Sequence, residues 1–238
     1  MSGEVDKSAL RVRRMFGQIA PRYDLVNHLL SLSIDRWWRR RAVRLAPPRG
    51  TEPILDVCTG TADLALAFRR VSEAGTPIVG ADFCRPMLAV AQGKCQRLGD
   101  RGRVDLVEAD ALRLPFPDDM FQMVSVAFGL RNMADTDGGL AEMVRVCRPG
   151  GRVAVLEFSM ASAWPIGPLY RWYFRRLLPW VGQAVARNDE LAYNYLPASV
   201  GAFPEGQALA ERMRAAGLRD VWFRRFTFGV STLYVGEK

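Results

Sequence analysis

Three acidic residues, each in or at the end of a short apolar run, are the side chains of this sequence best placed to do chemistry. Asp56 lies in the run 53–57, Asp82 ends the run 77–82, and Asp110 ends the run 104–110. Short apolar runs bounded by turn signals are typical of β-strands, and open α/β sheets bind ligands outside the carboxyl ends of their strands. We therefore expect these three carboxylates to meet at one edge of a parallel sheet.

The stretch 53–63 predicts a strand, a tight loop of small residues and the start of a helix. Such a loop brings main-chain N–H groups and a helix N-terminus close to a ligand. A dinucleotide fingerprint would require G-x-G-x-x-G, but here Gly60 stands alone and Ala62 takes the next glycine position. An ordinary loop with Asp63 in the first helical turn explains this stretch equally well.

The ligand that fits all three acids is S-adenosylmethionine. It has no pyrophosphate, and its ammonium and sulfonium suit carboxylates, so Asp56 and Gly60 are candidate contacts. A carboxylate after the second strand, Asp82, can accept both ribose hydroxyls. Asp110, after the third, can accept from the adenine amino group, and the N–H group of Ala111 would then face a ring nitrogen. We expect Ala62 to have a negative φ, because it begins a helix.

Composition indicates a folded α/β protein without metal chemistry. The chain has 238 residues, of which 49% are hydrophobic and 24% charged, and its four cysteines lack metal-ligand spacing. We found neither a secretory pattern nor an apolar run long enough to span a bilayer, which predicts a cytoplasmic protein. The net charge of +8 would suit nucleic acid or an anionic membrane. The arginines are dispersed along the chain, however, so we expect no nucleic-acid partner.

The order of the elements predicts one domain over residues 1–238. We expect an N-terminal helical cap (1–50), a cofactor-binding core (51–160), a helical substrate lid (161–203) and a final helix with a strand pair (204–238). Within the cap, 34–45 predicts an amphipathic helix with one face formed by Ile34, Trp37, Trp38, Ala42 and Leu45 and with arginines on the other. The stripe in 164–181 faces either the core, an apolar substrate or a lipid boundary.

The βα alternation from 53 to 159, followed by a helix and two β runs, is similar to class I S-adenosylmethionine-dependent methyltransferases. That fold is α/β, with a Rossmann-like seven-stranded sheet whose last strand is antiparallel. Four stretches narrow the resemblance: 23–27 with Ser31 and Trp38, the loop at Gly60, 128–132, and 145–159. Together they resemble the ubiquinone/menaquinone biosynthesis C-methyltransferase family over nearly the whole chain. Departures from the family pattern include Asp35, Ala62 and Cys147.

The resemblance implies that Thr61, Asp82, Asp110 and Ala111 contact S-adenosylmethionine. It also implies methyl transfer to a ring carbon of a polyprenylated quinol, from demethylmenaquinol to menaquinol. A benzoquinol of the ubiquinone pathway, or another apolar small molecule, is the alternative acceptor. A polyprenylated acceptor leads us to expect peripheral contact with the inner face of the cell membrane, and a homodimer remains an open alternative.

The candidates beside the reacting ring are Tyr23, Asp24, Arg131 and Asn132. Arg131 would stabilise a developing quinolate and Asn132 would orient a ring oxygen. Alternatively, Arg131 pairs with Asp24 or Glu157, and Asn132 caps the next helix. Positioning can supply roughly 7–11 kcal/mol, more than a general base, so we expect no obligatory histidine. Arg131→Ala is expected to lower turnover more than cofactor affinity.

Overall fold

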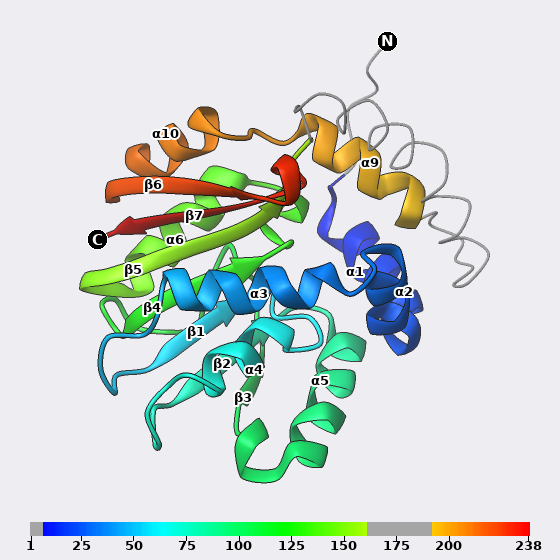
Figure 1. Cartoon of the computed structure of the whole chain (residues 1–238), viewed down its shortest axis with the longest axis horizontal. Helices are drawn as coiled ribbons and strands as arrows, with labels where there is room; N and C mark the ends of the chain where they lie inside the picture. Colours follow the sequence, from blue (N-terminus) through cyan, green and yellow to red (C-terminus); the bar gives the residue numbers. More distant parts are fainter. Residues whose placement is uncertain (1–6, 161–191) are drawn as a thin grey trace.

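The computed structural model of the protein describes residues 7–160 and 192–238. Within them, seven strands form one sheet in the order β3-β2-β1-β4-β5-β7-β6 (Figure 1). The strands from β1 to β5 run parallel, and β7 is antiparallel to both β5 and β6. The fold prediction is confirmed. The strands are β1 (Ile54–Val57), β2 (Ile78–Asp82), β3 (Asp105–Glu108), β4 (Phe121–Ala127), β5 (Cys147–Phe158), β6 (Arg219–Phe226) and β7 (Ser231–Glu237).

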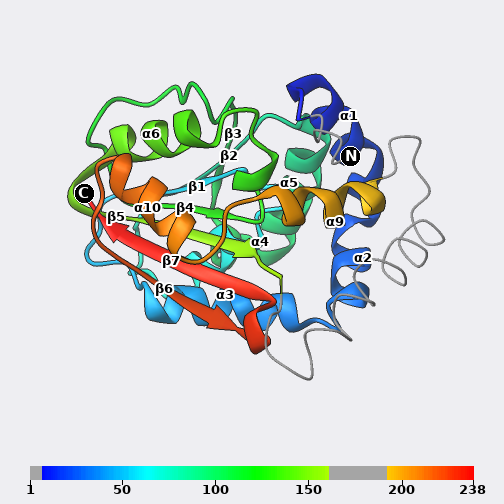
Figure 2. The ribbon, with the colours of Figure 1, turned by 90° about the horizontal axis from the view of Figure 1, so that it is seen from above.

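Helices cover both faces of this sheet (Figure 2). One face packs on α6 (Thr136–Val146) and α10 (Gln207–Ala215). The other packs on α3 (Ile34–Leu45), α4 (Asp63–Arg69) and α5 (Arg85–Leu98). The central strands β1 and β4 are therefore buried on both sides, and this explains why their sequences are nearly continuous apolar runs.

A separate group of elements lies beside the carboxyl ends of the parallel strands. It consists of α1 (Ala9–Ile19), the 3₁₀ turn η1 (Ala20–Arg22), α2 (Tyr23–Leu30) and α9 (Ala192–Ala202). Met15, Val26 and Val200 belong to the small core that joins α1, α2 and α9. Segments more than 150 residues apart in sequence thus lie together next to the edge where we expect the ligand.

The predicted helix 34–45 is present with those bounds, and Trp38 and Ala42 lie on its buried face as expected, but the assignment of two residues is wrong. Trp37 is half exposed, whereas Arg39, assigned to the outer face, is buried. The reason is electrostatic: the Arg39 guanidinium lies 2.6 Å from the Asp35 carboxylate and 3.7 Å from that of Asp63. A buried arginine held by two carboxylates replaces the apolar contact that periodicity alone would assign.

Three further features bear on the expected cap, the expected lid and the expected absence of a membrane-spanning segment. In the expected N-terminal cap, the first helix of the described residues is α1, which begins at Ala9 and passes into η1. The lid expected over 161–203 lies outside the described residues except for α9, so that part of the domain division stays a prediction. Among the helices of the described ranges, none combines the length and apolar character needed to cross a membrane.

Candidate functional site

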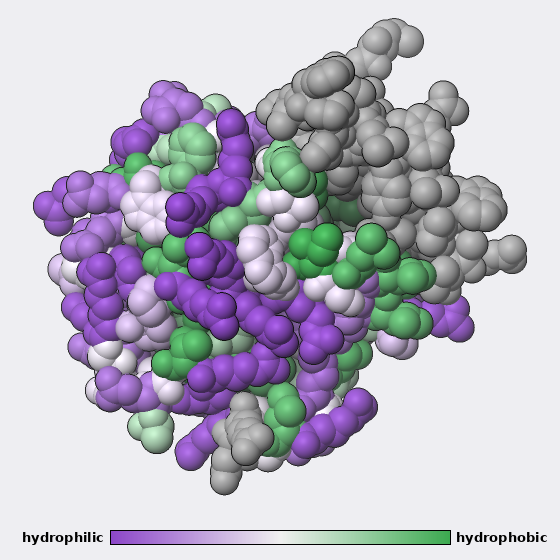
Figure 3. Space-filling view, viewed as in Figure 1, coloured by the Kyte–Doolittle hydropathy of each residue, from purple (hydrophilic) through white to green (hydrophobic). Residues whose placement is uncertain are grey.

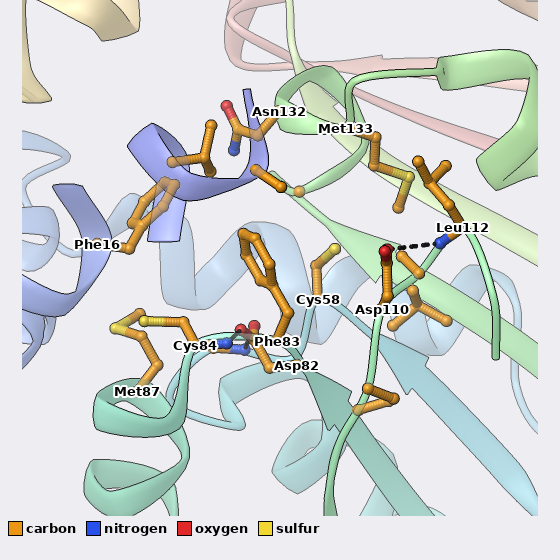
Figure 4. Close-up of a pocket in the computed structure, with 18 of the residues that line it drawn as sticks. Phe16, Cys58, Asp82, Phe83, Cys84, Met87, Asp110, Leu112, Asn132 and Met133 are labelled. Carbon is orange, nitrogen blue, oxygen red and sulfur yellow. Dashed lines mark hydrogen bonds between the residues drawn. The ribbon is translucent and has the colours of Figure 1, made fainter. Parts of the chain in front are cut away.

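A cavity opens at the carboxyl ends of the strands, between the sheet and α1 (Figure 4). Its walls are the segments that follow β1, β2, β3 and β4, together with Phe16 of α1 and Tyr23 of α2. Its empty volume is about 850 Å³, open solvent at the mouth included. Gly60, Asp82, Asp110 and Ala111, four of the six predicted cofactor contacts, line it.

Asp82 lies at the floor of the cavity and is held by two main-chain donors. Its Oδ2 accepts a hydrogen bond from the Gly60 N–H group and its Oδ1 accepts one from the Cys84 N–H group, both at 2.8 Å. Burial raises the pKa of Asp82, and these two bonds oppose the shift. A carboxylate can accept about four hydrogen bonds, so each oxygen keeps acceptor capacity for a ligand.

Asp110 and Ala111 line the same cavity. The Asp110 carboxylate accepts a hydrogen bond from the Leu112 N–H group at 2.9 Å, which closes a tight turn after β3 (Figure 4). This hydrogen bond fixes the direction of the Asp110 side chain. Because it uses only Oδ1, the other carboxylate oxygen keeps its acceptor capacity for a ligand. Both residues therefore present polar groups from the segment that sequence reasoning assigned to the adenine.

The other two predicted cofactor contacts, Asp56 and Thr61, are buried and do not line the cavity. The Asp56 carboxylate accepts from the hydroxyl groups of Thr59 at 2.7 Å and Ser125 at 2.8 Å. Burial raises the pKa of Asp56 to about 6. The Thr61 hydroxyl donates to the Asp24 carboxylate at 2.6 Å. In this structure both residues hold the loop in place, and direct contact with a ligand stays a prediction.

The expected negative φ of Ala62 is wrong. Its φ is +65°, and it is the N-cap residue of α4 rather than the first residue inside the helix. Cys58 and Gly60 of the same loop are also left-handed, with φ values of +51° and +55°. The loop therefore turns through alternate left-handed positions. Ala62 is strained in this conformation, which a glycine would adopt without a steric penalty.

Of the four predicted catalytic residues, Tyr23 and Asn132 line the cavity. The Asn132 amide donates to the Phe128 carbonyl oxygen at 3.2 Å, while its Oδ1 is buried and has no hydrogen-bond partner among the described residues. The next helix is capped by Asp135 and not by Asn132, so that alternative does not hold. Burial raises the pKa of Tyr23, so its phenol remains protonated at neutral pH. Figure 4 places Asn132 across the cavity from Asp82.

Arg131 is buried and does not line the cavity. Its guanidinium lies 2.8 Å from the Glu157 carboxylate at the end of β5 and donates to the Phe128 carbonyl oxygen at 2.5 Å. Its main-chain N–H group also donates to Glu157, at 3.2 Å. Of the two ion pairs considered from sequence, the structure has the one with Glu157. A role in stabilising a quinolate stays a prediction.

Asp24 also lies outside the cavity lining, and it leads to a residue that sequence reasoning missed. The Lys94 ammonium donates to Asp24 at 2.8 Å, to Asp63 at 2.5 Å and to the Thr61 hydroxyl at 3.2 Å. Lys94 therefore ties α5 to α2 and to the loop that ends β1. One signal was available: the chain has 33 basic residues but lysine only at 7, 94 and 238.

Lys7 is the second residue missed from sequence. It lines the cavity ahead of α1, and burial lowers its pKa. His28, by contrast, faces Asp35 at 3.1 Å and is not part of the cavity. The His28, Asp35 and Asp63 side chains lie close enough to ligate a metal, but both carboxylates already pair with Arg39.

Comparison with known proteins agrees with this arrangement. The model of the ubiE/COQ5 methyltransferase family matches residues 4–238. A demethylmenaquinone methyltransferase of Thermus thermophilus is 49% identical over 94% of this chain and all of its own length. One of Deinococcus radiodurans is 45% identical over 99% of this chain and 96% of its own. A ubiquinone/menaquinone biosynthesis C-methyltransferase UbiE of Geobacter sulfurreducens is 43% identical over 96% of this chain and 88% of its own.

Solved structures share the fold at much lower identity. A SAM-dependent methyltransferase of Thermotoga maritima superposes with a TM-score of 0.66 and 17% identity, covering 94% of this chain and 98% of that one. Another, from Aquifex aeolicus, gives a TM-score of 0.59 and 15% identity, covering 84% and 88%.

Proposed function

Because the chain belongs to the ubiE/COQ5 methyltransferase family, we propose that it transfers a methyl group from S-adenosylmethionine to a ring carbon of demethylmenaquinol. The observation that carries this proposal is the family match over residues 4–238. It is supported by two relatives named demethylmenaquinone methyltransferase, at 45% and 49% identity. The acceptor is a quinol ring rather than a nucleic acid or a nicotinamide, and the chain is an enzyme of quinone biosynthesis.

The residues of the cavity fit S-adenosylmethionine. Bound there, the cofactor supplies a methyl group already activated by its sulfonium. Asp82 retains acceptor capacity for the two ribose hydroxyls, and Asp110 and Ala111 offer one acceptor and one donor for the adenine. Gly129 allows the main chain after β4 to approach the loop after β1, since a Cβ there would lie 2.5 Å from the Cβ of Cys58. A dinucleotide would instead need the missing glycines.

For the acceptor we propose Asn132 and Tyr23 as the groups that touch the ring. The unpartnered Oδ1 of Asn132 can accept a hydrogen bond from a quinol hydroxyl, which enriches the ring carbon in electrons. The protonated Tyr23 phenol can donate to an oxygen of the ring. Arg131 acts through these groups: it fixes the Phe128 carbonyl oxygen that also holds the Asn132 amide. Asp24 acts similarly through Thr61.

The apolar part of the cavity suits an apolar acceptor. Phe16, Met87 and Met133 contribute side chains without charge to its wall. We propose that the prenyl tail leaves the cavity past α1, and that the protein works in the cytoplasm with peripheral membrane contact. A homodimer stays a prediction, since only one chain is described.

The test is methyl transfer from labelled S-adenosylmethionine to short-tailed demethylmenaquinol and to the corresponding demethylated benzoquinol, side by side under reducing conditions. We expect transfer to the naphthoquinol. Transfer to both rings would extend the proposal to the ubiquinone pathway, which the name of the Geobacter relative also covers. Cofactor binding without transfer to either ring would overturn the acceptor assignment.

A further inference from the structure

Large apolar side chains are exposed along one edge of the helical group formed by α2 and the start of α3. Leu25 is 63% exposed, Leu29 50%, Leu32 81% and Trp37 50%. Leu25 and Leu29, at the helical spacing i, i+4, lie on one side of α2, and Leu32 lies in the turn between α2 and α3. Phe228, 63% exposed, belongs to the turn Thr227–Gly229. This turn lies next to α3, because Thr227 accepts a hydrogen bond from the Trp38 indole and Trp37 packs edge-on against Phe226.

A basic groove lies next to this apolar edge, between α2, α3, α4 and α5. Six cationic side chains and two carboxylates line it, with Leu66, Ala67 and the exposed Leu98 as its apolar part. Lys94 and Arg39 are engaged by the carboxylates, as described above. The other four cations are exposed and have no hydrogen-bonding or ion-pair partner among the described residues: Arg36, Arg40, Arg70 and Arg97.

The apolar edge and the basic groove share a face of the molecule. Asp24 and His28 of α2 line the groove, and the residues that follow them, Leu25 and Leu29, form the apolar edge. Figure 3 shows hydrophobic side chains gathered over α2 and the start of α3, beside hydrophilic ones that extend along α3 and α4. A surface with unpaired arginines next to protruding leucines and tryptophan has two chemically different halves.

The apolar edge argues against a free anion or a nucleic acid as the ligand of this surface, and the basic groove argues against a purely apolar partner. A free anion or a nucleic acid would neutralise the arginines but leave the leucines in water, and nothing would be gained from their exposure. A purely apolar partner would instead bury unpaired guanidinium groups at a cost. An anionic lipid bilayer satisfies both, because phosphate headgroups lie at the depth of the arginines and acyl chains lie beneath them.

We propose that α2, α3, the carboxyl ends of α4 and α5 and the turn Thr227–Gly229 form the surface by which this protein binds an anionic membrane. Arg36, Arg40, Arg70 and Arg97 contact lipid phosphates, and Leu25, Leu29, Leu32 and Trp37 enter the boundary between headgroups and acyl chains. The proposal rests on the peripheral contact put forward under the proposed function and names its surface. Cofactor and acceptor are not needed for it, so it can be tested separately from the chemistry.

The test is flotation of the full chain, without cofactor or acceptor, with vesicles of phosphatidylcholine alone or with added phosphatidylglycerol. We expect binding to the anionic vesicles only, weakened by salt. Arg36→Gln/Arg40→Gln should lower the partition coefficient by roughly tenfold or more, on the basis of the known contribution of each arginine near an anionic surface. The control, Arg212→Gln/Arg225→Gln, makes the same charge change on the α10 and β6 side and should change it less than about threefold.

A second variant, Leu25→Gln/Leu29→Gln, leaves the charge unaltered and should weaken binding at low and high salt alike. All variants should methylate a soluble short-tailed quinol at the wild-type rate, which shows that they are folded. The proposal is overturned if wild-type protein does not float with anionic vesicles, if the arginine pair and its control behave alike, or if RNA or inorganic phosphate binds while vesicles do not. Absence of methyl transfer in the wild type, with flotation intact, would count against the proposed function alone.

Discussion

Asp56 shows how a carboxylate can serve the site without touching the ligand. It lies beneath the loop after β1, where burial raises its pKa to about 6, against about 3.9 in an unfolded chain. The unfolded state therefore gains more than the folded state from ionising Asp56 as the pH rises. Stability from this group is fully present below pH 4 and is lost as the pH rises through 6.

Asp56→Asn is therefore expected to make the protein more stable relative to wild type as the pH rises. The difference in unfolding free energy should shift in favour of the variant by about 2–3 kcal/mol between pH 4 and pH 7. Urea unfolding of both proteins across this range measures it, and subtracting one from the other removes the contribution of groups such as Asp82. A difference that stays constant with pH would show that Asp56 is not the titrating group.

Ala62 offers a second test at this scale, because it is a buried alanine in a left-handed conformation. In Ala62→Gly the relief of strain, about 1–2 kcal/mol, offsets the lost methyl contact, and stability should change by less than about 1 kcal/mol. Ala65→Gly is the matched control: it is equally buried but lies inside α4, and should cost about 2 kcal/mol. Equal costs in thermal unfolding would contradict a left-handed Ala62.

The sequence allowed the positions of two acidic residues of the site to be predicted, but not the hydrogen-bond partners of Asp56 and Thr61. Asp82 and Asp110 could be predicted because each follows a strand, and strand ends of a parallel sheet meet at one edge. That Asp56 and Thr61 face hydroxyl and carboxylate partners instead of the cavity depends on Ser125 and Asp24, which are distant in sequence. The conformation of Ala62 likewise depends on the whole loop and not on its place before a helix.

At the scale of elements, ion pairs between side chains hold the helices and loops of the site together. Lys94 of α5 contacts Asp24 of α2, and also Asp63 and Thr61 beside the cofactor loop. Arg131 and Glu157 likewise join the turn Leu130–Asn132 to the end of β5. Similar pairing explains why Arg39 is buried and not on the outer face predicted for it, since it is held by Asp35 of α3 and by Asp63 of another helix.

Lys94→Met is expected to loosen this junction. It leaves Asp24 and Asp63 without their shared cation, which should cost about 1–3 kcal/mol and raise the KM for S-adenosylmethionine more than it lowers kcat, because Thr61 loses support. Lys238→Met is the control, since it removes a more exposed pair with Asp119 and should cost less than 1 kcal/mol. Thermal unfolding and initial rates report both effects; equal effects of the two variants would remove Lys94 from the site.

At the scale of the whole molecule, the sheet was predictable and the surroundings of its edge were only partly so. Short runs with turn signals between them predicted the strands, and the pattern is strongest for β1 and β4, which are buried on both faces. The helix α9 falls within the lid expected over 161–203, but its own bounds could not be predicted, since its pattern is weak and it contains Pro197. Its place beside α1 and α2 follows from packing between segments far apart in the chain.

The family match leads to the central claim, that the methyl group is delivered to a ring carbon. The most direct measurement is the structure of the product formed from demethylmenaquinol and S-adenosylmethionine carrying a ¹³C-labelled methyl group, determined by NMR spectroscopy and mass spectrometry. The account predicts a single product with the label on a ring carbon and both ring oxygens unmethylated. A methyl ether, with the label on oxygen, would contradict it.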